Sequence, residues 1–150
     1  MLETLLSLAT MAASAFLAAT ILPFPSEATF AALLLRGQLN PVVLLVVATV
    51  FNTLGSVVNW WIGKIIADGG IGRLPERLRP DPETLARGER LFGRFGWLAL
   101  LLSWVPGIGD LGTVAAGLLR YPLWRFAMLV GIGKCARYGA IWAGWIAMAG

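Results

Sequence analysis

The sequence contains no histidine and only one cysteine, Cys135. Histidine is the commonest metal ligand in proteins and the side chain that most often transfers protons near neutral pH. A single cysteine excludes an intrachain disulfide and argues against a cysteine-based metal cluster. Metal-dependent hydrolysis and triad chemistry are therefore poor hypotheses, and we expect no metal, no cofactor and no enzymatic activity.

Charge is also scarce. Only 13% of the 150 residues are charged, 58% are apolar, and the mean hydropathy is +0.77. A soluble domain of this size could not cover so much apolar surface, so the composition predicts an integral membrane protein. The length allows about four to six membrane-depth segments, which predicts one domain over residues 1–150. The first apolar run should stay attached, because a signal peptide needs a basic start and no Lys or Arg precedes Arg36.

Two segments are long enough to cross a bilayer as helices. The 22 residues from Val42 to Gly63 carry no charge and no proline, and they would span about 33 Å as a helix. Residues 122–149 are also long enough, with Pro122 suited to the first turn. We expect the tryptophans, including Trp60, Trp61 and Trp97, to be anchors at the membrane interface.

Two other apolar regions are interrupted near membrane depth. One contains Pro23-Phe24-Pro25-Ser26-Glu27, and the other contains Pro106-Gly107-Ile108-Gly109-Asp110. Too few apolar residues follow each break to cross a bilayer, so both regions are predicted to be re-entrant hairpins. Backbone freed by proline and glycine at that depth must be buried in protein or face water. We therefore expect the two tips to shelter each other, and the predicted tip residues are Pro23, Pro25, Ser26, Pro106, Gly107 and Gly109.

The two halves of the sequence share this order of features. The predicted fold is an all-α integral membrane protein of two inverted repeats, each a broken re-entrant hairpin followed by a transmembrane helix. Residues 1–66 form the first repeat, 67–94 a basic loop with a short helix from Asp81 or Pro82 to Arg94, and 95–150 the second repeat. Most cations outside the apolar segments lie between Lys64 and Arg125. The positive-inside rule places this loop in the cytoplasm and both chain ends on the other side.

Ionisable residues at membrane depth are the candidate functional residues, because a charge there costs at least about 2.5 kcal/mol. These residues are Glu27, Asp110, Lys134 and Arg137, and we expect the two acids to approach the two cations. Asn52, Asn59 and Tyr138 are weaker candidates for lining a pocket. A lipid phosphate could exchange for a carboxylate on the arginine, since a guanidinium holds two phosphate oxygens. The alternative is that these charges form static ion pairs that only hold the hairpins in place.

Several motifs together resemble the DedA superfamily, also called the SNARE-associated or VTT-domain family, and most of all its short YqaA-type branch. They are Pro23 to Glu27, Gly55 to Lys64, Phe92 to Gly96, Pro106 to Asp110, Ala116-Gly117 and Gly133 to Tyr138. The resemblance implies a protein of a bacterial-type cytoplasmic (inner) membrane that acts as a lipid flippase or scramblase, moving a phospholipid or polyprenyl phosphate between leaflets. It also implies that Glu27 corresponds to the essential hairpin acid of the family.

Two alternatives to lipid transport stay open. The chain could be a proton-coupled transporter of a small ion or drug, or a structural membrane protein that transports nothing. The expected partners are membrane lipids with anionic or phosphate-bearing headgroups, and protons; a homo-oligomer is left open. No nucleic-acid partner is expected, because the polar segment has no aromatic-basic platform.

Overall fold

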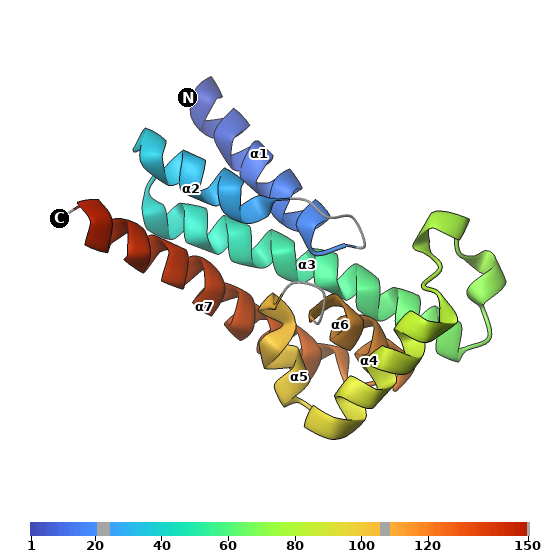
Figure 1. Cartoon of the computed structure of the whole chain (residues 1–150). Helices are drawn as coiled ribbons and strands as arrows, with labels where there is room; N and C mark the ends of the chain where they lie inside the picture. The colour runs from blue at the N-terminus through green and yellow to red at the C-terminus, as the bar shows by residue number, and fades with distance from the viewer. Residues whose placement is uncertain (21–24, 106–108, 150) are drawn as a thin grey trace. The chain divides into compact units, whose positions relative to one another are not determined.

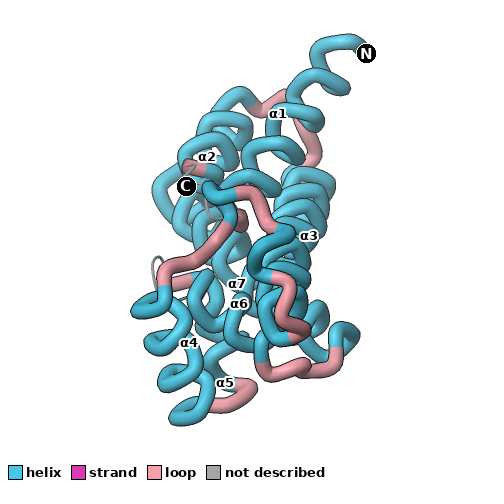
Figure 2. Tube along the Cα trace, turned by 90° about the vertical axis from the view of Figure 1, so that its right-hand side faces the viewer, coloured by secondary structure: helices cyan, strands magenta, loops and turns pink. Residues whose placement is uncertain are grey.

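A computed structural model describes residues 1–20, 25–105 and 109–149. Helix is the dominant structure, and the described part of the chain contains no strand (Figure 2). The predicted all-α class is confirmed, whereas the inverted repeat stays a prediction. Pro23, Pro106 and Gly107 lie outside the described residues.

The helices follow the predicted order along the chain (Figure 1). They are α1 Leu2–Ala18, α2 Ser26–Arg36, α3 Pro41–Ala67, the 3-10 helices η1 Ile71–Arg73 and η2 Glu76–Leu78, α4 Pro82–Phe95, α5 Leu98–Leu101, the 3-10 helix η3 Leu102–Trp104, α6 Gly109–Leu118 and α7 Leu123–Ala149.

Helix α3 is the one helix in the described ranges that is long and apolar enough to cross a membrane. Only 28% of its most apolar 18-residue stretch is buried within the protein. Most of the surface of this stretch is therefore available to lipid. Asn40 begins the helix, because its side-chain oxygen accepts a hydrogen bond from the Val42 amide at 2.8 Å. The second predicted span corresponds to α7, which has 27 residues but carries Arg125, Lys134 and Arg137.

Contacts divide the chain into two compact units. Unit 1 comprises Met1–Gly55 with Lys134–Gly150, and unit 2 comprises Ser56–Gly133. Helices α3 and α7 therefore each contribute one part to each unit. The repeats predicted over residues 1–66 and 95–150 follow chain order instead, and they stay a prediction.

Unit 1 is built on the hairpin of α1 and α2, which pack against each other. Its buried cluster contains Met11 and Ala15 of α1, Phe30 of α2, Ala48 of α3 and Tyr138 of α7. Tyr138 of α7 is thus buried among residues from the first third of the chain, and Ile141, Trp142 and Trp145 of α7 pack against the same cluster.

Unit 2 is built on α6, which packs against α4, α5 and η3. Its buried cluster contains Trp60 of α3, Leu100 of α5, Ala116 of α6, and Phe126 and Val130 of α7. The expectation that Trp60 is an interface anchor is wrong. Its side chain is 6% exposed, and its indole N–H donates to a backbone carbonyl, whereas the neighbouring Trp61 is 48% exposed.

The central polar segment is more structured than a solvated loop. Helix α4 begins after Asp81 as predicted, and it buries Gly88 against Leu111 and Ala115 of α6. The sequence did not predict this packing, because glycine has no apolar side chain that would mark its position as part of a buried helix face.

Two glycines set the closest approach of α3 and α6. A Cβ atom on Gly117 would lie 1.9 Å from the Trp60 carbonyl oxygen, and one on Gly63 would lie 2.0 Å from the Val114 carbonyl oxygen.

We expect Gly117→Ala to lower the free energy of unfolding by about 1 to 3 kcal/mol or more, because the two helices must move apart. Gly139→Ala is the matched control, since open space surrounds a Cβ there and alanine favours helix. Titration with sodium dodecyl sulfate in mixed micelles measures both; equal stabilities would contradict this packing.

Asp81 gives the start of α4 a defined pH dependence. The Thr84 hydroxyl and the Thr84 amide donate to its carboxylate at 2.5 and 2.9 Å, and these bonds hold the pKa of Asp81 below its ordinary value of 3.8. Because the folded pKa is depressed, the cap stabilises the helix fully above pH 3.8 and is lost as the pH falls through the lower folded value. The Thr84 amide proton resonance should titrate with a midpoint below 3.8, and Asp81→Asn should abolish that titration. A midpoint at or above 3.8 would show that the cap is absent.

Candidate functional site

The first predicted hairpin tip leads into the first turn of α2. Pro25 precedes the helix, Ser26 is its first residue, and Glu27 follows in the first turn. A carboxylate in this position interacts favourably with the positive end of the helix dipole. Ser26 is completely buried and Glu27 is partly exposed, so the two neighbours face different surroundings.

Glu27 forms an ion pair with Arg137 of α7, between the carboxylate Oε1 and the guanidinium Nη2. The side chains are 33% and 21% exposed, respectively. By comparison, Glu83 and Arg87 on α4 form an ion pair with side chains 71% and 60% exposed. The pair at the tip is therefore more protected, as expected for an acid that approaches a cation of the last helix.

A buried chain of hydrogen bonds runs beside this ion pair. The Tyr138 hydroxyl donates to Ser26 Oγ at 2.9 Å, and the Asn52 amide donates to the Tyr138 oxygen at 3.0 Å and to the Ala15 carbonyl at 2.9 Å. Asn52 and Tyr138 were predicted to line a pocket. Here they join α1, α2, α3 and α7 within unit 1, and each is at most 1% exposed.

Lys134 lies three positions before Arg137 in α7 and is 2% exposed. Positions three apart share one face of a helix, so the two cations lie on the same side of α7. Cys135 between them is exposed, and it points away from the buried face.

The second predicted tip belongs to unit 2. A Cβ on Gly109 would lie 2.0 Å from the Ser103 carbonyl oxygen, so the start of α6 closes tightly onto η3 and requires glycine there. Asp110 lies in the first turn of α6, but its side chain is outside the described part of the structure. Asn59 donates to Thr113 of α6 at 3.2 Å. The two asparagines of α3 therefore act in different units.

Sequence reasoning missed the buried hydroxyl groups. Thr113 is completely buried, and Ser14 of α1 donates to Thr29 of α2 at 3.0 Å. Small hydroxyl side chains inside apolar helices were the available signal. The described residues include no group of three or more His, Cys, Asp or Glu that could hold a metal ion.

The helical fold and the long, apolar and largely exposed helix α3 are consistent with a membrane protein. Residues 22–145 match the family described as the VTT domain. The chain belongs to this family, the DedA family.

Curated relatives agree with this membership. The chain is 35% identical over 136 residues to "Inner membrane protein YqaA" of Escherichia coli, covering 91% of this chain and 89% of that one. It is 37% identical over 142 residues to an "Uncharacterized protein" of Haemophilus influenzae, covering 90% and 85%. An "Alkaline phosphatase-like protein" of Lactococcus lactis is 27% identical over 120 residues, which cover 74% of this chain and 56% of that one. No solved structure matches the chain.

The hydrogen-bond chain makes Tyr138 a sensitive position. We expect Tyr138→Phe to lower the free energy of unfolding by about 1 to 3 kcal/mol, because buried polar groups of Ser26 and Asn52 lose their common partner. Tyr121→Phe is the matched control, since the ring of Tyr121 packs edge-on to Phe92 at the margin of unit 2. Detergent unfolding followed by tryptophan fluorescence measures both variants. A loss no larger than that of the control would show that the hydroxyl contributes no stability.

Proposed function

We propose that this protein moves a phosphate-bearing lipid between the two membrane leaflets. The observation that carries the proposal is the ion pair of Glu27 and Arg137 at the first hairpin tip. Charges at membrane depth are costly, so chains retain them mainly where they bind or move something.

The chemistry of the pair suits exchange of one anion for another. A guanidinium holds a carboxylate or a phosphate through the same planar fork of N–H donors. Both side chains are partly exposed, so a headgroup can reach Arg137 while the hydrogen-bond chain behind it stays closed. Lys134, on the same face of α7, adds a second positive charge that favours an anionic ligand.

Glu27 supplies the return step in this proposal. While a phosphate occupies Arg137, the displaced carboxylate can take up a proton, which removes the repulsion between two anions. When the proton leaves, the carboxylate reclaims the arginine and releases the headgroup. Proton uptake at Glu27 would thus couple the cycle to pH.

The proposed location is the bacterial inner membrane, because the similar Escherichia coli protein YqaA is named an inner membrane protein. We propose the inverted repeat with residues 67–94 on the cytoplasmic side, supported by the excess of arginine in that segment. In this arrangement Asp110 would act in the second repeat as Glu27 does in the first.

A leaflet-exchange assay in proteoliposomes tests the proposal. Labelled undecaprenyl phosphate and labelled phosphatidylethanolamine are each followed with the wild type, Glu27→Gln, Asp110→Asn and Arg137→Gln. We expect Glu27→Gln and Arg137→Gln to slow exchange at least about tenfold, the effect of losing about 1.4 kcal/mol of charge stabilisation. The pH dependence of the wild type should also disappear in Glu27→Gln.

The controls for this assay are Glu83→Gln and Arg87→Gln, which break the exposed ion pair of α4 with the same changes of charge. Exchange should be unaffected in both. If the wild type moves neither lipid at any pH, lipid translocation is wrong for these lipids and small-ion transport becomes the next hypothesis. If exchange is intact in the Glu27 and Arg137 variants, the pair is a static clamp.

A further inference from the structure

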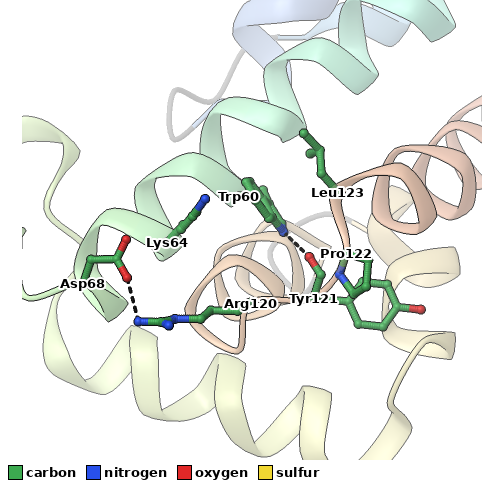
Figure 3. A pocket seen from close by; sticks show the side chains of 7 residues that line it. All are labelled: Trp60, Lys64, Asp68, Arg120, Tyr121, Pro122 and Leu123. Carbon is green, nitrogen blue, oxygen red and sulfur yellow. Dashed lines mark hydrogen bonds and ion pairs between the residues drawn. The ribbon is translucent and has the colours of Figure 1, made fainter.

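A second charged feature of the protein lies in unit 2. A pocket of about 440 Å³ opens where α3 ends and α6 turns into α7 (Figure 3). Its charged lining side chains are Lys64, Asp68 and Arg120, two cations against one carboxylate. Trp60 and the turn from Tyr121 to Leu123 form the rest of the wall.

The backbone of Arg120 is unusual. Its φ is +54°, and it is the one non-glycine residue with positive φ in the described ranges. Arg120 follows the last turn of α6, where its amide bonds to the Gly117 carbonyl and the Tyr121 amide bonds to the Ala116 carbonyl, at 2.9 and 2.8 Å. Glycine is the residue favoured at such a helix end. Helix α2 ends that way, with Gly37 at φ +63°.

The strain at Arg120 calls for an explanation in its side chain. Residues with a Cβ are disfavoured in the left-handed region, so such a conformation persists where the side chain serves a purpose. The guanidinium contacts the Asp68 carboxylate at 2.7 Å, but these side chains are 66% and 51% exposed. Exposed ion pairs contribute little to stability. This contact alone therefore does not offset the strain.

The pocket lies at one end of α3, where lipid headgroups are expected if this helix crosses the membrane. The 27 residues of α3 extend about 40 Å, close to the thickness of a bilayer with its headgroups. Lys64 is in the last turn of α3, and its ammonium lies 5.1 Å from the ring of Trp61, which is exposed. Tryptophan beside lysine at the end of a span is typical of the membrane interface.

The turn that carries Arg120 is held against this end of α3. The Trp60 indole N–H donates to the Tyr121 carbonyl at 2.9 Å, one residue beyond Arg120. Lys64 at the end of α3 and Arg120 in the turn after α6 are therefore kept at one pocket by a fixed backbone. Donors whose backbone is already in place lose less entropy when they bind an anion.

We propose that Lys64 and Arg120 bind the phosphate group of an anionic lipid headgroup in this pocket. Asp68 holds Arg120 while the pocket is empty and yields it to the ligand, since a guanidinium binds phosphate in the same planar mode. Pro122 and Leu123 give the glycerol end of the lipid an apolar wall. This site goes beyond the proposed function, because it requires neither transport nor the Glu27–Arg137 pair.

Native mass spectrometry of the detergent-purified full chain tests the site. The protein is titrated with short-chain phosphatidic acid, with short-chain phosphatidylcholine and with inorganic phosphate. We expect phosphatidic acid to bind most tightly, and Arg120→Gly and Lys64→Gln each to weaken its binding about fivefold, as expected for one cation at a headgroup. Asp68→Asn should strengthen binding, because the competing carboxylate is removed. Arg77→Gln, an exposed cation outside the pocket, is the matched control.

Arg120→Gly also separates binding from folding. Glycine adopts the left-handed backbone without strain. The melting temperature of the Arg120→Gly variant should therefore equal or exceed that of the wild type. The proposed site is wrong if the wild type binds phosphatidic acid no more tightly than Arg120→Gly and Lys64→Gln do. Inorganic phosphate bound as tightly as phosphatidic acid, with the same dependence on the variants, would replace a lipid by a soluble phosphate compound. Leaflet exchange is not measured in detergent, so either proposal can fail while the other stands.

Discussion

The hydrogen bonds of Asn52 are the constraint on which unit 1 depends. Its amide reaches a backbone carbonyl of α1 and the hydroxyl of Tyr138 on α7, and that hydroxyl reaches Ser26 at the start of α2. Apolar contacts between helices lack direction, and in lipid they compete with equally apolar acyl chains. Hydrogen bonds with fixed lengths and angles can instead set the rotation of each helix. The position of the Arg137 side chain depends on these hydrogen bonds. Arg137 is the residue before Tyr138, and it reaches Glu27 only if α7 has the correct rotation.

In unit 2 the helices are oriented mainly by close backbone packing at glycine residues. Gly63 and Gly117 let the backbones of α3 and α6 approach each other directly, and Asn59 adds one hydrogen bond to Thr113. The chain thus uses a polar network in one unit and close backbone packing in the other. The ion pair of unit 1 is attached to a network that fixes it, whereas the two pocket cations of unit 2, Lys64 and Arg120, lie at the end of α3 and just after the end of α6.

The sequence predicted those features that depend on composition and on breaks in apolar runs. The helix at α3, the capped helix at α4, the start of α2 after Pro25, and the approach of Glu27 to a cation of α7 all follow from proline, charge and run length. It did not predict the burial of Trp60, since a tryptophan near a helix end has the same neighbours in sequence whether it faces lipid or protein. Nor did it predict the left-handed Arg120, because a rule that expects glycine there cannot identify an exception.

Cys135 lies between Lys134 and Arg137 on an exposed part of α7, and it is the only thiol in the chain. A thiol-reactive spin label or fluorophore would therefore attach at one position without the removal of any other cysteine. Thiols react as thiolates, which form in water and not in hydrocarbon. The rate at which membrane-impermeant reagents label Cys135 would thus report whether water reaches this part of α7, in the native sequence and in the membrane of intact cells.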